Sequence, residues 1–303
     1  MQADMGPVPT AGQIDEVAPG LRRILAPNPS PMTLHGTNTY LVGTTDLAVI
    51  DPGPDNPRHL EAILAAVGSG QRISHILVTH AHLDHSPLAP ALARATGAPV
   101  LAYGDAQAGR SAIMQKLAEQ GLAGGGEGVD ASFRPDLLLP DGGTVQGDGW
   151  RIEALWTPGH FGNHLCFALG DILFTGDLVM GWASSLVSPP DGDLTDFMAS
   201  CARLQTRSDR LYLPGHGAPV ADPAQRLDWL ITHRLAREAA ILAALASGPA
   251  TAEALAARIY TDTPAPLLPA AARNVFAHLI DLTQKNRVKP RPHLSWIADF
   301  HPL

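Results

Sequence analysis

A chain of 303 residues with 45% hydrophobic and 17% charged residues has the composition of a globular protein and is long enough for two domains. Residues 1–222 hold 12 Lys+Arg against 23 Asp+Glu (net −11), and residues 223–303 hold 9 against 6 (net +3), so the N-terminal part does not favour nucleic-acid binding over a wide face. No apolar run approaches the roughly 18 residues of a membrane span. The N-terminus lacks a secretion-signal pattern, and the two cysteines of the chain, Cys166 and Cys201, suggest no disulfide framework. We therefore expect a cytoplasmic protein without a membrane partner.

The first half of the chain predicts strands alternating with helices. Apolar runs bounded by turn residues indicate the strands, and capping residues followed by apolar residues at helical spacing indicate the helices. The elements expected, in order, are short strands in 16–26 and 37–50 with a turn at 43–45, a helix from Asn56-Pro57, a helix from Leu88 to Gly97, and a strand at 99–103.

A segment between the strands holds most of the metal-competent side chains. Residues 73–86 read ISHILVTHAHLDHS, and the apolar run 76–78 is typical of a buried strand. Alternation along an extended backbone would send His80 and His82 to the same side, so that both imidazoles could reach one cation. Asp84 and His85 come after the turn into the next helix and could point at a second cation.

The next segment, residues 104–136, shows little regular pattern and includes GGGEG at 124–128. Loops this long are usually functional lids or disordered segments. We expect a mobile flap over the site, which would shape the pocket together with the SPPDGD loop at 188–193.

Further strand ends carry single metal-competent side chains. Strands are expected at 144–156, 164–175 and 211–213, and a helix from about Asp193. Where a ligand lies on a Gly-containing turn at the end of a strand, the rigid sheet fixes the direction of its side chain and the turn lets that side chain reach the metal. The turns concerned are TPGH with His160, FTGD with Asp177 and PGHG with His216.

The C-terminal part predicts three helices and a hairpin. The elements expected are a helix at 224–246, a helix capped by Thr251, a linker at 264–269, a helix from Asn274 and a hairpin at 288–297. This is the element order of a winged helix. The domains expected are therefore 1–222 and 223–303.

These motifs together resemble the metallo-β-lactamase superfamily. His-x-His-x-Asp-His after a buried strand, the three later turns, and Asp51 in VIDPG follow its pattern in order. The C-terminal part resembles the winged-helix domain of one branch, which includes the mitochondrial lactamase-β-like endoribonuclease. The resemblance implies an α+β fold: a four-layer αββα sandwich, with the site at one edge of its two sheets, followed by a small winged-helix domain.

The resemblance also implies a dinuclear metal centre. His80, His82 and His160 would hold one ion, Asp84, His85 and His216 the other, and Asp177 would bridge them. Asp84 and Asp177 are expected to be catalytic as well. Imidazole and carboxylate donors without thiolate favour two Zn²⁺, with Mn²⁺ or Fe²⁺ possible. Behind the ligands, Asp51 would orient an imidazole or order the metal loop, and His164 is expected to be an outer or structural residue rather than an acid.

Such a centre predicts a hydrolase that uses a metal-bridging hydroxide on a small ester-type substrate such as a thioester or lactone. One alternative is an endoribonuclease that cleaves single-stranded RNA, so RNA is a possible partner; against it stand the acidic N-terminal part and an aromatic content of 5%. The non-enzyme alternative is a winged-helix nucleic-acid-binding regulator. A basic run at 285–291 invites that interpretation, but we favour a solvated helix end beside the active-site mouth or in a homodimer contact.

Overall fold

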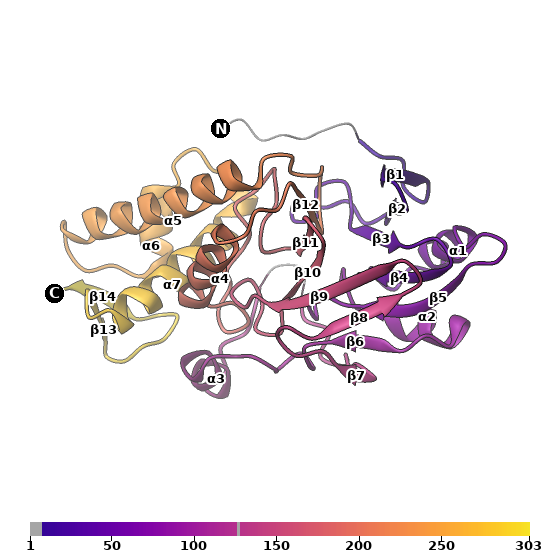
Figure 1. Ribbon diagram of the computed structural model, residues 1–303. Coiled ribbons are helices and arrows are strands. Elements are labelled where there is room, and N and C mark those ends of the chain that lie inside the picture. Colours follow the sequence, from indigo (N-terminus) through magenta and orange to yellow (C-terminus); the bar gives the residue numbers. More distant parts are fainter. Residues whose placement is uncertain (1–7, 126–127) are drawn as a thin grey trace.

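Two β-sheets packed face to face, with helices on both outer sides, form the N-terminal part of the computed structural model (Figure 1). The structure describes residues 8–125 and 128–303. The first sheet has the order β1-β2-β3-β4-β5-β6-β7, and the second has the order β12-β11-β10-β9-β8. The strands of the first sheet are β1 (Ile14–Ala18), β2 (Leu21–Leu25), β3 (Asn38–Val42), β4 (Asp46–Ile50), β5 (Arg72–Leu77), β6 (Val100–Ala102) and β7 (Leu137–Leu138). Those of the second are β8 (Thr144–Gly147), β9 (Trp150–Trp156), β10 (Leu165–Leu169), β11 (Ile172–Gly176) and β12 (Leu211–Pro214).

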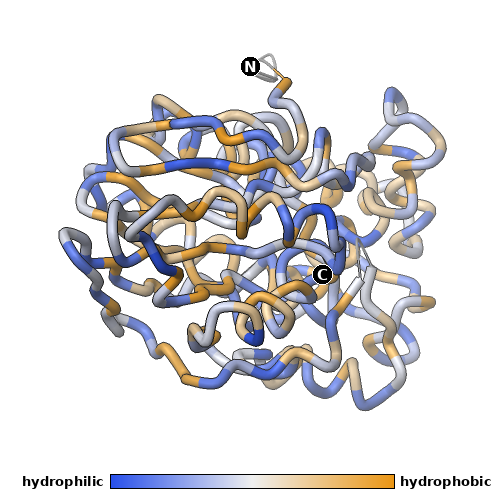
Figure 2. Tube along the Cα trace, turned by 90° about the vertical axis from the view of Figure 1, so that its right-hand side faces the viewer, coloured by the Kyte–Doolittle hydropathy of each residue, from blue (hydrophilic) through white to orange (hydrophobic). Residues whose placement is uncertain are grey.

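Three apolar clusters hold the four layers together. Tyr40 and Phe174 meet between the sheets, with ring centroids 5.2 Å apart. On the outer side of the first sheet lie α1 (Pro57–Ala65) and α2 (Ala89–Thr96), and on that of the second sheet α4 (Leu194–Gln205) buries Phe197. Hydrophilic residues are frequent in the outer loops, as the trace coloured by hydropathy shows (Figure 2). The αββα sandwich expected from the resemblance is therefore confirmed.

Local capping chemistry explains where the helices begin and end. The side chain of Asn56 accepts hydrogen bonds from the backbone N–H groups of Arg58 and His59 at the start of α1. Asp193 does the same for Thr195 at the start of α4. Gly97 ends α2 in the left-handed conformation, with a φ of 73°, which glycine adopts without strain. These boundaries agree with the sequence-based predictions.

The C-terminal part is helical and ends in a two-stranded sheet. Its elements are α5 (Pro223–Leu245), α6 (Ala252–Ile259), a 3-10 turn η1 (Ala265–Leu267), α7 (Leu268–Gln284), β13 (Val288–Arg291) and β14 (Asp299–Pro302). The order is that of a winged helix. Helix α5 packs Leu230 against α4 and Leu245 into the C-terminal core. We still propose a boundary at 222/223, where α5 begins.

The structure corrects several expected elements. The stretches 16–26, 144–156 and 164–175 are hairpins rather than single strands, because each contains a glycine with a positive φ at a tight turn: Gly20, Gly149 and Gly170. Helix α7 begins at Leu268 and not at Asn274, so part of the expected linker is helical. The last hairpin extends to Pro302.

The segment 104–136 is also more ordered than predicted. It contains α3 (Ala112–Glu119), capped by Ser111, and this helix buries Met114 and Leu117 in the C-terminal core. Apolar residues at helical spacing anchor it there, which contradicts the prediction of a mobile flap, although residues 126–127 of the GGGEG run lie outside the described residues. None of the helices in the described part of the chain is long and apolar enough to span a membrane. The expectation that the N-terminus carries no secretion signal concerns a segment whose first seven residues lie outside the described range.

Candidate metal centre

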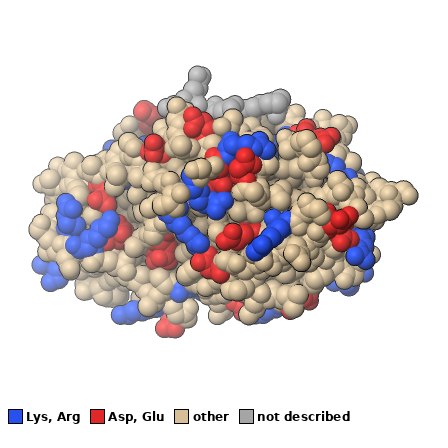
Figure 3. Space-filling view, in the orientation of Figure 1, with Lys and Arg blue, Asp and Glu red and all other residues tan. Residues whose placement is uncertain are grey.

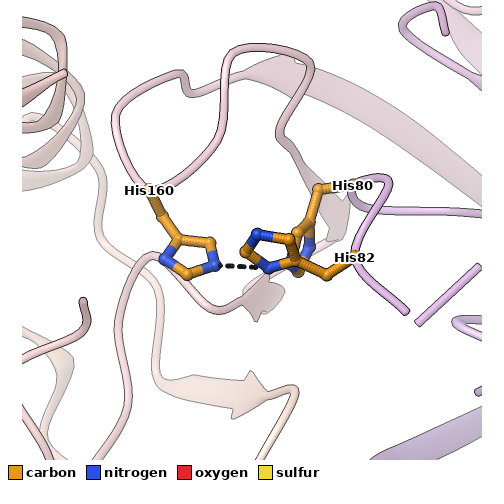
Figure 4. A group of neighbouring side chains, drawn as sticks. All are labelled: His80, His82 and His160. Carbon is orange, nitrogen blue, oxygen red and sulfur yellow. Dashed lines mark hydrogen bonds between the residues drawn. The ribbon is translucent and has the colours of Figure 1, made fainter. Parts of the chain in front are cut away.

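The predicted ligands converge at one edge of the two sheets. Three of their ring nitrogens meet at one point: His82 Nδ1 lies 2.9 Å from His80 Nε2 and 3.1 Å from His160 Nε2 (Figure 4). His80 and His82 follow β5. His160 follows β9, about eighty residues later in the chain. All three side chains are buried.

A second group lies next to the first. It contains Asp84, His85, Asp177 and His216, whose ligand atoms lie within 4.8 Å of one another. Asp177 Oδ2 lies 3.2 Å from His216 Nε2 and 3.8 Å from His160 Nε2, so this carboxylate faces both groups. That position suits a ligand shared between two ions.

The turns that carry these ligands require glycine. A Cβ on Gly159, in TPGH, would lie 2.2 Å from the backbone of Phe197, and its φ is +138°. A Cβ on Gly176, in FTGD, would lie 2.6 Å from His164 Nε2. Only a residue without a side chain fits either turn, so these glycines allow the ligand loops to pack closely against their neighbours.

Asp51 lies behind the ligands and holds two of them in place. Its carboxylate accepts hydrogen bonds from the Thr79 N–H at 2.7 Å and the Thr79 hydroxyl at 2.7 Å, and it lies 2.9 Å from His85 Nδ1. The Thr79 hydroxyl is in turn 2.9 Å from His80 Nδ1. Asp51 has a φ of +50°, a left-handed conformation that its three contacts stabilise.

Two further ligands are oriented by backbone carbonyls. His160 Nδ1 donates to Leu186 O at 2.7 Å, and His216 Nδ1 donates to Gly36 O at 3.1 Å. Because a carbonyl can only accept, Nδ1 carries the proton in both rings and Nε2 is left as the ligand atom.

His164 is fully buried below this cluster. Its Nδ1 lies 3.0 Å from the Thr157 hydroxyl, and its ring centroid lies 5.3 Å from that of His80. It does not line the pocket over the ligands. This placement suits a structural residue better than an acid that reaches a substrate.

The electrostatics of the two groups differ. Burial lowers the pKa of His82 to about 3 and that of His80 well below its usual value, so both imidazoles are neutral at pH 7. Burial also opposes a charge on His216, but the carboxylates of Asp177 and Asp84 outweigh it and raise its pKa to about 10. Cation binding at the second group must therefore displace a proton.

The residues present fit a pair of metal ions. Nε2 of His80 and Nε2 of His160 both lie at about hydrogen-bond distance from the same nitrogen of His82, which carries at most one proton, an arrangement that a shared cation stabilises. Asp84 Oδ1 is buried and has no hydrogen-bond partner among the described residues. Histidine and carboxylate donors without thiolate are compatible with a dinuclear site.

A pocket of about 220 Å³ opens onto the ligands. Its walls come from three places: the loop at 31–32, the segment 180–186 and helix α7 with the turn before it. Among the described residues, neither the segment 104–136 nor the loop 188–193 lines it, which corrects the prediction that they shape the pocket. Helix α3 of that segment packs in the C-terminal core instead. No motif in the sequence marks the wall residues. Most of them are apolar, among them Met32, Met180, Trp182, Leu186, Leu267 and Ala270, and three are polar: Ser184, Ser185 and Asn274.

Comparison with known proteins agrees with this geometry. Residues 32–216 match the family model described as metallo-beta-lactamase superfamily, and residues 251–296 match the beta-lactamase associated winged helix domain. The chain belongs to the metallo-beta-lactamase superfamily and carries the associated winged helix.

Similar proteins with more specific names are also known. An atrochrysone carboxyl ACP thioesterase from Aspergillus fumigatus is 31% identical over 246 residues, which cover 78% of this chain and 69% of that protein. The lactamase-like protein adaB from Aspergillus niger is 33% identical, over 78% and 68% of the two chains. A metallo-beta-lactamase family protein from Thermus thermophilus has a similar structure, with a TM-score of 0.75, 26% identity and coverage of 95% and 100%.

Proposed function

We propose that this protein is a dinuclear metallohydrolase that cleaves a small ester-type substrate, either a thioester of a hydrophobic acyl group or a lactone. The observation that carries the proposal is the apolar pocket that opens directly onto the clustered histidines and carboxylates. Relatives named as thioesterases support the same reaction type. The proposed ligands are those predicted from the sequence: His80, His82, His160, Asp84, His85, His216 and the shared Asp177.

When bound, two Zn²⁺ ions would supply Lewis acidity, which lowers the pKa of a water and polarises a substrate carbonyl; Mn²⁺ or Fe²⁺ could do the same. The protein's own contribution is orientation. Asp51 and the Leu186 carbonyl hold ligand rings at fixed angles. Asp84, with Oδ1 free of partners among the described residues, can accept the proton of the attacking water, and Asp177 adds negative charge between the two groups.

The pocket favours a neutral acyl group over a polyanion. No Lys or Arg is found among the pocket-lining residues in the described part of the chain. Single-strand nucleic-acid sites combine a positively charged groove with aromatic side chains on which bases stack. Among the described residues, Trp182 is the only Phe, Tyr or Trp that lines this pocket. Lys285, in the basic run, is paired with Asp281 at 2.6 Å and Glu238 at 3.3 Å.

Surface charge agrees with this preference. Positive and negative side chains are interspersed over the face shown in Figure 3 rather than gathered into one broad basic area. RNA binding, a homodimer and a cytoplasmic location remain predictions.

One panel of assays tests the proposal. Metal-loaded protein is incubated with aryl and alkyl thioesters, lactones, bis-p-nitrophenyl phosphate and labelled single-stranded RNA, and His82→Ala protein is the control. We expect about two ions per chain, thioester or lactone turnover, and loss of both metal affinity and turnover in Asp177→Ala. RNA cleavage that His82→Ala abolishes, without thioester or lactone turnover, would refute the substrate assignment. Full activity with less than one ion per chain would refute the dinuclear centre.

A further inference from the structure

We propose that two residues of the C-terminal part, Asn274 and Arg234, position the metal ligand His160 through the peptide group between Leu186 and Val187. The winged-helix side of the molecule is then a structural component of the metal site. The inference rests on the proposed metal centre and is independent of the substrate.

One peptide group connects the ligand to the C-terminal part. Its carbonyl, Leu186 O, accepts the hydrogen bond from His160 Nδ1 at 2.7 Å. Its N–H, on Val187, donates to Asn274 Oδ1 at 3.1 Å. The C=O and N–H of a trans peptide point in opposite directions, so His160 and Asn274 hold the same rigid plane from its two sides. A rotation of that plane would break both bonds and turn the imidazole.

Asn274, on α7, is fixed in one orientation. Its Oδ1 accepts a second hydrogen bond, from Arg234 Nη1 at 2.9 Å. Because both neighbours are donors, the oxygen of the amide must face them. The Nδ2 group has a single contact in the described part of the chain, at 3.5 Å to Ala270 O, and Asn274 lines the pocket.

Arg234, on α5, holds the same segment from behind. Its side chain is 2% exposed, and Nη2 donates to Ser184 O at 2.6 Å and Ser185 O at 2.5 Å. No ion pair among the described residues includes Arg234. A buried cation without a carboxylate is costly unless it makes hydrogen bonds, and here Nη1 donates to Asn274 and Nη2 to the segment that carries Leu186, while Nε has no partner among the described residues.

A second arginine of α5 supports this segment at its other end. Arg226 donates to Met180 O at 2.7 Å and Ala183 O at 2.6 Å. Segment 180–186 forms one wall of the pocket. Helix α5 therefore fixes the segment through carbonyl oxygens, and Asn274 transmits that fixed position to the ligand.

The test compares two substitutions at one position. Asn274→Leu removes the acceptor, whereas Asn274→Asp keeps an acceptor for the Val187 N–H and the Arg234 guanidinium. Metal affinity is measured by competition with a chromophoric chelator and Zn²⁺. We expect Asn274→Leu to weaken one of the two sites about 10-fold, the lower end of the effect of removing an outer partner of a metal ligand. Asn274→Asp keeps the acceptor and adds a negative charge beside the site, so it should not weaken metal binding.

A matched control removes a different hydrogen bond between the same parts of the molecule. Thr195, on α4, donates to Asp281 Oδ1 on α7 at 2.8 Å, away from the Leu186–Val187 peptide. Thr195→Val should lower the melting temperature of the metal-free protein as Asn274→Leu does, but leave metal affinity unchanged. Long-range ¹⁵N NMR of the wild type, which needs no variant, should show the proton of His160 on Nδ1.

Several results would overturn the inference. Wild-type metal affinity in Asn274→Leu, an equal loss in Asn274→Asp, or a His160 proton on Nε2 would each do so. A wild-type protein that binds no metal refutes the proposed function instead. Two bound ions with an unaffected Asn274→Leu protein refute only the positioning role.

Discussion

Acid should destabilise the fold through a buried histidine outside the metal site. His278, on α7, is 1% exposed, and neither ring nitrogen has a hydrogen-bond partner among the described residues. Burial, assisted by the nearby cations Arg234 and Lys285, lowers its pKa to about 3. In an unfolded chain the same side chain titrates near its ordinary pKa of about 6.5.

The sign of the effect follows from which state binds the proton. Above pH 6.5 both states hold a neutral imidazole, and His278 adds no pH dependence. Below it, the unfolded chain takes up the proton while the folded chain does not, so stability falls by about 1.4 kcal/mol per pH unit until the folded pKa is reached. At pH 5 the loss is about 2 kcal/mol.

The matched substitution is His278→Leu, which keeps a similar volume and cannot titrate. Urea unfolding of the metal-free proteins at pH 7.5 and pH 5 gives the free energy of unfolding of each. Wild type should lose about 2 kcal/mol more than the variant between these values. Parallel losses in the two proteins would show that His278 is protonated in the folded state or solvated, and would refute the reasoning.

Three other predictions follow from the site. Gly215→Ala should weaken metal binding at least tenfold by chelator competition, because its Cβ would lie 2.5 Å from Asp177 Oδ1; Gly68→Ala, facing only the flexible Gln71 side chain, is the control, and equal affinities would contradict the prediction. Asp51→Asn should cost roughly 10–100-fold in metal affinity, since it disturbs the contacts to Thr79 and His85, and an unchanged titration would rule this out. Trp182→Ala should raise KM for long-chain thioesters more than for acetyl thioesters, with kcat little changed; equal effects on both would remove Trp182 from the acyl site.

The sequence alone was informative wherever chemistry is local. His80, His82, Asp84 and His85 lie within six residues after a buried strand, and glycine turns mark the three distant ligands. Caps such as Asn56 and Asp193 act within one helical turn, so helix starts were predictable. The hairpin turns at Gly20, Gly149 and Gly170 were also local, and their glycines could have been used to divide the three stretches that were predicted as single strands.

Tertiary structure decided the surroundings of the metal site. From the sequence alone, the apolar side chains of Met114 and Leu117 could have packed over the ligands. In the fold they pack into the C-terminal core, whose other residues come more than a hundred positions later in the chain. The pocket walls combine residues 31–32, 180–186 and α7, a grouping set by how the layers pack and not by any spacing in the chain. Asn274 reads as an ordinary helix residue in the sequence. Its link to His160 exists because Leu186 and Val187 share one peptide plane between the two parts of the fold.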